Sequence, residues 1–243
     1  MTIVRSTLFN VFFFTATFII ALVPGMFVRL VAPERVLGVA RMWARIIVGA
    51  ARVICGIRLQ VHGLERLEGS DARLIASNHQ SAFDTIVWLT LLPRCCYVVK
   101  QELLRIPLFG PLLSLSGMIA VDRGGGGAAL RLLLREADRA LREKRQIVIF
   151  PEGTRATPGV TLPLQSGVAA LAARMHLPVV PVVTDSGRCW GRRSFHKRPG
   201  TIHIHVLEPI PAETTRAQLM QCLEITLRTD PTQLEQAVEN SVG

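Results

Sequence analysis

The stretch Arg73-Leu74-Ile75-Ala76-Ser77-Asn78-His79-Gln80-Ser81-Ala82-Phe83-Asp84 decides how this chain folds. It opens with a short apolar run typical of a buried strand, and the apolar segment Ala82–Leu92 is typical of a helix. His79 therefore stands where a strand ends and a helix begins, five residues before Asp84. In α/β sheets, side chains at the carboxyl ends of strands commonly form the functional site.

Two interpretations of His79 and Asp84 are open. Ser81-x-x-Asp84 is a helix capping box, in which Asp84 supports the helix start and His79 is an ordinary loop residue. Alternatively, Asp84 orients His79 as a general base near neutral pH. Residues five apart in a helix are rotated by about 140°, so the second interpretation requires His79 to lie before the helix. Because the capping box starts the helix at Ser81, both interpretations can hold together.

After residue 57, short β-rich runs alternate with longer helical patterns. The predicted strands are Arg58–His62, Arg73–Ser77, Cys95–Val99, Met118–Val121, Gln146–Phe150, Val179–Val183 and Thr201–Leu207. The predicted helices are Ala82–Leu92, Glu102–Ser116, Ala128–Glu143, Pro163–Arg174 and Thr214–Arg228. This alternation predicts an α/β domain over residues 58–243, with a largely parallel central sheet flanked by helices.

Residues 1–57 are predicted to form an N-terminal membrane anchor of hydrophobic and amphipathic helices. Ser6–Val28 contains no charged residue, and about 20 apolar residues suffice to span a bilayer. Asn10 and the Pro24-Gly25 pair interrupt this segment, so a re-entrant helix is an alternative to a spanning one. A cleaved signal peptide is a weaker alternative, because no convincing small-residue cleavage site follows.

Val36–Ile57 has the pattern of an amphipathic helix, with Arg41, Arg45 and Arg52 on one face and Trp43 on the other. This pattern favours a helix lying at an anionic membrane surface. The alternative is a helix packed on its own domain with the arginines in water. We favour the membrane surface, because the uncharged segment stands directly before this helix.

The charge distribution also bears on localisation and partners. The formal charge is +10, and the first 60 residues carry seven arginines and one glutamate. Positive residues flanking an apolar segment predict that the following domain stays on the cytoplasmic face of the inner membrane. Only 6% of residues are aromatic, and the charge gathers beside the apolar segment, which disfavours nucleic acid as a partner. The five cysteines have no metal-binding spacing and indicate a reducing compartment.

Three further strand ends carry charged side chains. Lys100 ends one predicted strand, the pair Asp122-Arg123 ends another, and Glu152 and Arg155 follow a third. Together with the histidine and aspartate described above, they predict one site that combines a base with a cationic pocket. Arginine suits a phosphate group, which its guanidinium can bind through two parallel hydrogen bonds.

Four ordered motifs in the chain resemble those of the glycerolipid acyltransferases. They are Asn-His-x4-Asp from residue 78, Gly-x-Ile-x-Val-Asp-Arg from 117, Phe-Pro-Glu-Gly-Thr-Arg from 150 and Leu-Pro-Val-Val-Pro-Val from 177. The chain most resembles the bacterial 1-acylglycerol-3-phosphate acyltransferases, over about residues 58–210. The resemblance implies acyl transfer from acyl-CoA or acyl-carrier protein to the sn-2 hydroxyl of lysophosphatidic acid, giving phosphatidic acid. It implies no cofactor, and it implies an N-terminal helical anchor among membrane phospholipids.

The resemblance also implies roles for individual residues. His79 deprotonates the acceptor hydroxyl and Asp84 orients it, so that the substrate hydroxyl takes the place of the serine in a Ser-His-Asp triad. The chain has no Gly-x-Ser-x-Gly motif, which agrees with a reaction that needs no acyl-enzyme. The implied substrate-binding residues are Lys100, Arg123, Glu152, Gly153, Thr154 and Arg155.

Gln165 departs from the family pattern. It stands where many members carry a lysine after the third motif, so the cationic pocket is either one charge weaker or completed by Arg192 and Arg193. This departure leaves open another acceptor, such as a different lysophospholipid or a lyso-ornithine lipid. A catalytically silent lipid-binding protein is a further alternative, which the intact His79 and Asp84 disfavour.

No metal site is predicted from the histidines. His203 and His205 alternate along one predicted strand and so share a face, but two histidines without a third ligand are usually polar strand residues. His62, His176 and His196 have no potential partner nearby in the sequence.

Overall fold

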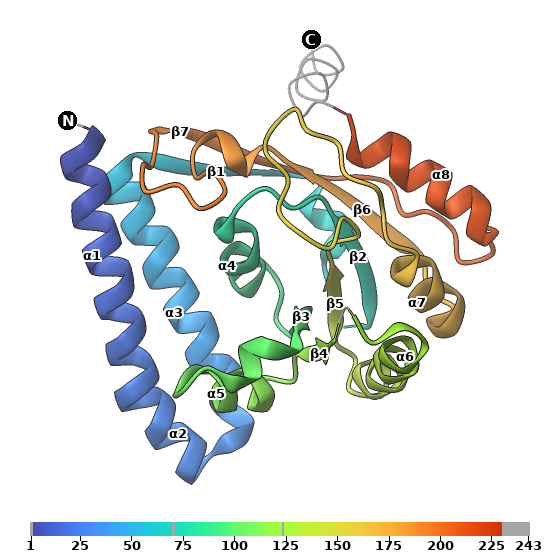
Figure 1. Cartoon of the computed structure of the whole chain (residues 1–243), viewed down its shortest axis with the longest axis horizontal. Coiled ribbons are helices and arrows are strands. Elements are labelled where there is room, and N and C mark those ends of the chain that lie inside the picture. Colours follow the sequence, from blue (N-terminus) through green and yellow to red (C-terminus); the bar gives the residue numbers. More distant parts are fainter. Residues whose placement is uncertain (1, 70, 123, 230–243) are drawn as a thin grey trace.

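The computed structural model describes residues 2–69, 71–122 and 124–229. Within them, the chain forms one seven-stranded sheet in the order β1-β7-β6-β2-β5-β3-β4 (Figure 1). The strands are β1 (Ile57–His62), β2 (Arg73–Ser77), β3 (Cys95–Lys100), β4 (Ile119–Val121), β5 (Gln146–Ile149), β6 (Val179–Thr184) and β7 (Gly200–Val206). Neighbouring strands are parallel except β6 and β7, which confirms the predicted fold class.

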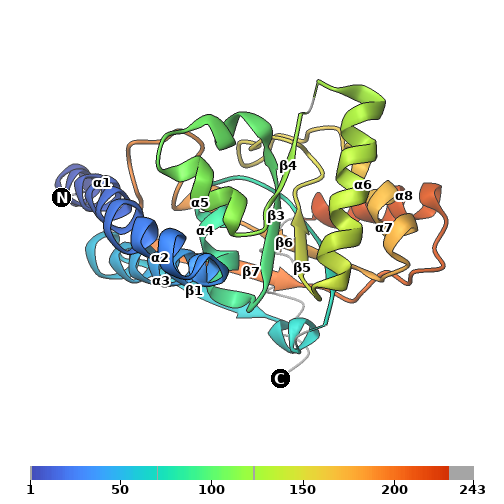
Figure 2. The same ribbon diagram turned by 90° about the horizontal axis from the view of Figure 1, so that it is seen from below.

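Helices cover both faces of the sheet (Figure 2). They are α1 (Thr2–Ile20), α2 (Met26–Val31), α3 (Val36–Ala50), α4 (Ala82–Leu91), α5 (Phe109–Leu115), α6 (Gly126–Arg142), α7 (Gly167–Met175) and α8 (Arg216–Leu227). One hydrophobic core joins α1, α3 and α4 to the sheet, and a second joins α6, α7 and α8 to its other face. The N-terminal helices α1 and α3 therefore share a core with α4 and the sheet.

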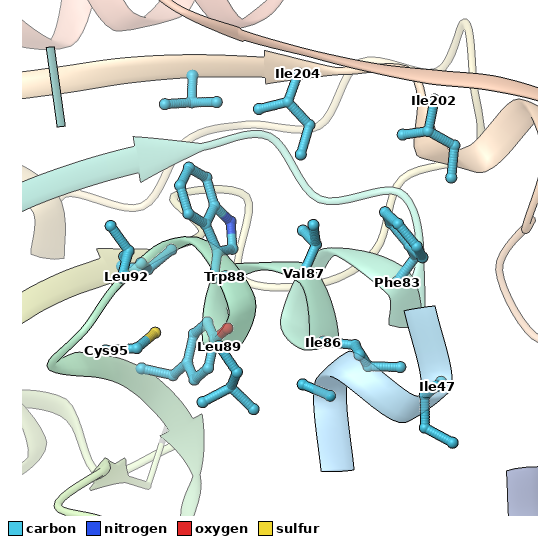
Figure 3. Packing of buried hydrophobic residues seen from close by; sticks show 14 of the residues in the cluster. Ile47, Phe83, Ile86, Val87, Trp88, Leu89, Leu92, Cys95, Ile202 and Ile204 are labelled. Carbon is cyan, nitrogen blue, oxygen red and sulfur yellow. The ribbon is translucent and has the colours of Figure 1, made fainter. Parts of the chain in front are cut away.

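Helix α4 is buried on nearly all sides, as expected for a helix that is apolar around its whole circumference. Val87 and Trp88 pack toward Ile202 and Ile204 of β7, while Ile47 of α3 lies on the opposite side of the helix (Figure 3). Trp88 is 1% exposed. This packing fixes the start of α4, and with it the loop that carries His79.

The uncharged N-terminal segment forms one continuous helical stretch, Thr2–Val31. Within the described residues, this stretch of 30 residues is long and apolar enough to cross a membrane, and only 6% of its most apolar window is buried inside the protein. The predicted interruption at Pro24 is a π-helical turn, Ala21–Gly25, whose wider winding accommodates a residue without an N–H group. Gly25 allows close packing on α5, because a Cβ there would lie 2.9 Å from Leu112 Cδ1.

The structure favours the second interpretation of α3, a helix packed on its own protein, and membrane contact of this helix stays a prediction. Its apolar face is buried within the protein, where Ala44 and Ile47 pack in the core that includes α4. Arg45 is exposed, while the Nε atom of Arg41 donates a hydrogen bond to the Leu89 carbonyl oxygen at 3.4 Å.

The predicted helix Glu102–Ser116 is wrong as a single element. A 3-10 helix, Gln101–Arg105, is followed by a break and then by α5. Pro107 has no N–H group to donate, and Leu108 adopts a positive φ of 64°. Predicted helix 163–174 likewise begins only at Gly167, after an extended segment.

A buried lysine fastens α1 to the loop between β6 and β7. Lys197 is 2% exposed, and its main-chain N–H donates to Ser6 Oγ at 2.9 Å. Its Nζ donates to Asn10 Oδ1 at 3.1 Å and lies 4.9 Å from the centroid of the Trp190 ring, a cation–π contact. Burial lowers the pKa of Lys197. The start of the apolar helix is thus held by polar contacts to the sheet domain.

Candidate active site

The main chain of His79 is held on both sides by the turn that follows β5. Its N–H donates to Glu152 Oε2 at 2.9 Å, and its carbonyl oxygen accepts from the Ala156 N–H at 2.7 Å. The imidazole stacks on the Phe150 ring, with 4.1 Å between centroids and 21° between planes. Two motifs that are separate in the sequence therefore form one rigid unit.

Asp84 contacts both the N-cap of helix α4 and the side chain of His79. Its Oδ2 atom lies 2.9 Å from His79 Nδ1 and accepts main-chain hydrogen bonds from Gln80 and Ser81, each at 2.8 Å. Ser81 Oγ accepts from the Phe83 N–H at 3.0 Å, which completes the helix start. His79 lies before the helix, as the sequence requires for the pair to meet, so the capping box and the His79–Asp84 contact are present together.

The contact with Asp84 determines which nitrogen of His79 is available for chemistry. Asp84 is 1% exposed, and an ionised carboxylate can only accept hydrogen bonds, so the proton resides on Nδ1 of His79. Nε2 then carries a lone pair and can accept a proton. The His79 side chain is 11% exposed, which leaves its edge accessible to a substrate. This arrangement can perform general base catalysis.

Glu152 lies beside the histidine in an unusual electrostatic state. Burial raises its pKa from 4.5 to about 7, and the charge of Asp84 adds to this increase, while the hydrogen bond from the His79 N–H opposes it. The turn that presents Glu152 is closed by the Gly153 N–H, which donates to the Phe150 carbonyl oxygen at 2.9 Å. Gly153 has a φ of 68°, a conformation that glycine adopts without strain.

Arg155 is half-buried near the catalytic pair. Burial lowers its pKa, the positive charges of Arg192 and Arg193 lower it further, and Asp84 opposes this decrease. Arg155 thus lies within electrostatic range of both Asp84 and the basic loop at residues 192–193. These three arginines form a cationic region next to His79.

The remaining predicted site residues are placed less centrally. Thr154 is exposed in the same turn, and Lys100 is exposed at the end of β3. Gln165 is also exposed, and its N–H donates to the Pro151 carbonyl oxygen at 2.7 Å. Arg123 lies outside the described residues. The structure therefore brings Glu152, Gly153 and Arg155 to the histidine, whereas Lys100 only shares the carboxyl edge of the sheet.

An apolar cavity of about 230 Å³ opens between the N-terminal helices and the sheet domain. Its lining comes from α1, α3, α4, β3 and α5 and includes Thr17, Trp43, Leu89, Val99, Leu113 and Arg155. Arg155 is its only charged lining residue among those described. Sequence reasoning missed this cavity, because its walls come from segments that pair only in the folded chain.

A second cavity of about 210 Å³, with a mixed polar and apolar lining, lies next to the same turn. Asn78, Glu152, Asp185 and Arg188 are among its lining residues. The Asn78 side chain holds the ends of β2 and β6 together, since its amide exchanges two hydrogen bonds with the Thr184 main chain at 2.9 and 2.8 Å. Glu152 and Arg155, three residues apart, therefore line two different cavities.

Comparison with known proteins agrees with this geometry. The family model described as acyltransferase matches residues 58–185. A 1-acyl-sn-glycerol-3-phosphate acyltransferase of Pseudomonas aeruginosa is 35% identical over 175 residues, which are 72% of this chain and 68% of that protein. The chain belongs to the acyltransferase family. The family resemblance drawn from the four motifs is confirmed.

Other acyltransferases support the same assignment. The human 1-acyl-sn-glycerol-3-phosphate acyltransferase alpha is 34% identical over 166 residues, 67% of this chain and 58% of that protein. The crystal structure of a 1-acyl-sn-glycerophosphate acyltransferase from Thermotoga maritima has the same fold, with a TM-score of 0.75 at 21% identity. That similarity covers 94% of this chain and 95% of the Thermotoga chain, so it includes the N-terminal helices.

Proposed function

We propose that this acyltransferase moves a fatty acyl group from acyl-CoA or acyl-carrier protein to the sn-2 hydroxyl of 1-acylglycerol-3-phosphate, forming phosphatidic acid. The observation that carries the proposal is the His79–Asp84 pair, which lies within electrostatic range of an arginine that also lines an apolar cavity. A base, a phosphate-binding group and a site for an acyl chain are the parts that this reaction needs. The names of the relatives from Pseudomonas aeruginosa and human point to the same acceptor.

The chemistry follows from the free Nε2 atom of His79. Nε2 takes the proton of the acceptor hydroxyl as its oxygen attacks the thioester carbonyl carbon. The tetrahedral intermediate then collapses: the carbon–sulfur bond breaks, and the proton passes from His79 to the leaving thiolate. Asp84 keeps the imidazole in the required tautomer and stabilises its protonated form, as the aspartate of a catalytic triad does. No acyl-enzyme forms on this route.

Charged side chains bind the phosphate group of the acceptor, and an apolar surface binds acyl chain carbon atoms. Arg155, with Arg192 and Arg193, binds the acceptor phosphate through charge-assisted hydrogen bonds. Phosphate binding by Lys100 and Arg123 stays a prediction, since Lys100 lies at the end of β3 and Arg123 is outside the described residues. The apolar cavity next to Arg155 accommodates acyl chain carbon atoms away from water.

The outer surface of Thr2–Val31 supports a membrane location. Large apolar side chains are exposed along it, among them Phe14, Phe18 and Phe27. On its inner side, Thr17 and Ile20 line the apolar cavity, so one helix faces both lipid and the substrate chain. We place this helix in the inner membrane with the sheet domain on the cytoplasmic face. Alkaline extraction of membranes should leave the protein in the pellet, and proteolysis of inside-out vesicles should cleave the sheet domain.

An acceptor panel tests the proposed reaction. Purified full-length protein in detergent is assayed with acyl-CoA and acyl-carrier protein against lysophosphatidic acid, lysophosphatidylcholine, a lyso-ornithine lipid and glycerol 3-phosphate. Lysophosphatidic acid should give the highest kcat/KM. The exposed Gln165 is the observation that favours another acceptor, and a clear preference for one would replace lysophosphatidic acid while keeping acyl transfer. Absence of transfer to every acceptor by folded protein would indicate a lipid-binding protein instead.

A further inference from the structure

Three histidines from two distant segments meet on one face of the sheet. β1 and β7 are neighbours in the sheet (Figure 1). They run parallel, and His62 pairs with His205 while Gln60 pairs with His203. Because successive residues of a strand point to opposite faces, His203 and His205 face away from the core that contains Ile202 and Ile204. The three imidazoles therefore lie on the face opposite the N-terminal helices.

The three rings lie close together. The His62 ring centroid is 4.5 Å from that of His205 and 5.9 Å from that of His203, with interplanar angles of 5° and 13°. One ring nitrogen from each histidine lies within 4.8 Å of the other two. In a tetrahedral zinc site with Zn–N bonds of about 2.1 Å, ligand nitrogens are about 3.4 Å apart. To bind an ion, the nitrogens must approach one another by up to about 1.4 Å, and the stacked rings must turn their lone pairs toward one point.

The surroundings of the cluster favour a bound cation. The Nε2 atoms of His62 and His205 are buried and have no hydrogen-bond partner within the described residues, although buried polar atoms are normally paired. The Asp185 carboxylate accepts from the His203 main-chain N–H at 2.8 Å, and its charge is partly offset by Arg188, whose Nη1 lies 3.8 Å from Asp185 Oδ2.

The cluster is distinct from the catalytic histidine. β6 separates β7 from β2, so two strand spacings, roughly 10 Å, lie between the cluster and the strand that leads to His79. The three histidines come from β1 and β7, whereas His79 follows β2. A ligand bound to the three histidines would link β1, the first strand along the chain, to β7, the last one.

We propose that His62, His203 and His205 form a binding site for Zn²⁺ or a similar divalent transition metal, with a fourth position open to water. Imidazole nitrogens suit zinc, copper, nickel and iron, whereas Mg²⁺ and Ca²⁺ prefer oxygen ligands. The expectation of no metal site rested on two histidines, and the pairing of β1 with β7 supplies the third. This proposal is independent of the proposed acyl transfer.

Metal titration tests the site directly. Full-length protein without a polyhistidine tag is treated with a chelator, desalted, and titrated with Zn²⁺ in competition with a chromophoric indicator. One Zn²⁺ should bind per chain, and Mg²⁺ should not compete. His62→Gln and His205→Gln should each lower the Zn²⁺ affinity more than about 100-fold, beyond the roughly 10–100-fold that loss of an outer-shell hydrogen bond costs. His196→Gln, at an exposed histidine outside the cluster, should bind as the unchanged protein does.

Two further readouts guard against a variant that fails to fold. Zn²⁺ should raise the Tm of the unchanged protein and of His196→Gln, but not that of His62→Gln, whose position is only half-buried. Co²⁺ should give the intense visible absorption of a four-coordinate site in the unchanged protein, and Zn²⁺ should abolish it. Equal Zn²⁺ affinity in His62→Gln and the unchanged protein, or no binding by the unchanged protein, would overturn the proposal. Acyl transfer by the chelated protein is measured separately, so failure of one proposal leaves the other intact.

Discussion

The imidazole of His79 lies in very different surroundings from the imidazoles of the cluster formed by His62, His203 and His205. Nδ1 of His79 meets a carboxylate, and both its main-chain groups are hydrogen-bonded to the turn after β5. In the cluster, the imidazoles meet one another, and two buried nitrogens have no hydrogen-bond partner within the described residues. The difference shows that the neighbours of a histidine decide its chemistry. In the proposed mechanism a carboxylate partner makes the histidine a base, whereas in the proposed metal site the unpaired Nε2 atoms of His62 and His205 are offered to a metal ion.

The largest effect should come from His79→Ala. Without the base, the rate of acyl transfer should fall by about 10³–10⁴-fold. His62→Gln, measured after chelation, should keep the rate within a few-fold of the unchanged protein, because the cluster takes no part in proton transfer. Initial rates measure both effects, and circular dichroism checks that both variants fold. Near-normal turnover by His79→Ala would mean that His79 is not the base, and that it does not differ from the cluster in its contribution to catalysis.

Asp84→Asn should come next and separate the two tasks of this residue. An amide can still cap the helix, but it does not stabilise the protonated imidazole, so kcat should fall by about 10²–10⁴-fold. Ser81→Ala is the matched control, since loss of a cap should cost about 1 kcal/mol of stability and leave kcat nearly unchanged. Urea unfolding and steady-state kinetics measure both quantities. A similar loss of kcat in both variants would mean that Asp84 acts only through the helix.

Arg155→Ala should act mainly on the acceptor. A charge-assisted hydrogen bond contributes about 1.5–3 kcal/mol, so the KM for the phosphorylated acceptor should rise about 10–100-fold. The KM for the acyl donor should stay within a few-fold. Arg192→Ala should raise the acceptor KM less, because Arg192 is exposed. An unchanged acceptor KM in Arg155→Ala would argue against a phosphate site there.

The smallest expected effect concerns Glu152 and pH. Because its pKa is about 7 in the folded protein and 4.5 when unperturbed, the folded state binds more protons between those values. Stability therefore falls as pH rises from about 4.5 to 7, by on the order of 1–3 kcal/mol from this group. Glu152→Gln removes the titration. The difference in free energy of unfolding, variant minus unchanged protein, should therefore be larger at pH 8 than at pH 5. An equal difference at both pH values would contradict the raised pKa.

Patterns among residues close together in the sequence were enough to predict part of this structure. Three features were predicted because each depends on residues close together in the sequence. They are the helix start at Ser81, the position of His79 before that helix, and the alternation of strands and helices. The break before α5 had its own signal in Pro107, which the apolar pattern around it concealed.

Features that depend on distant pairing were not predicted. The buried face of α3, the apolar cavity and the third histidine of the cluster all arise from segments far apart in the chain. His62 became a partner only through the register of β1 against β7. Amphipathic spacing shows that a helix has an apolar face, but it does not show whether protein or lipid covers that face.

The contacts of Lys197 with Ser6 and Asn10 impose an order on biosynthesis. These partners are 191 and 187 residues apart, so the ribosome completes α1 long before it makes the loop that fastens it. The apolar helix can therefore enter a bilayer while its polar partner is still unmade. Closing so long a segment is slow compared with local helix formation, and it comes late in synthesis. We therefore expect the apolar helix to reach the membrane first and to be fastened to the sheet domain afterwards.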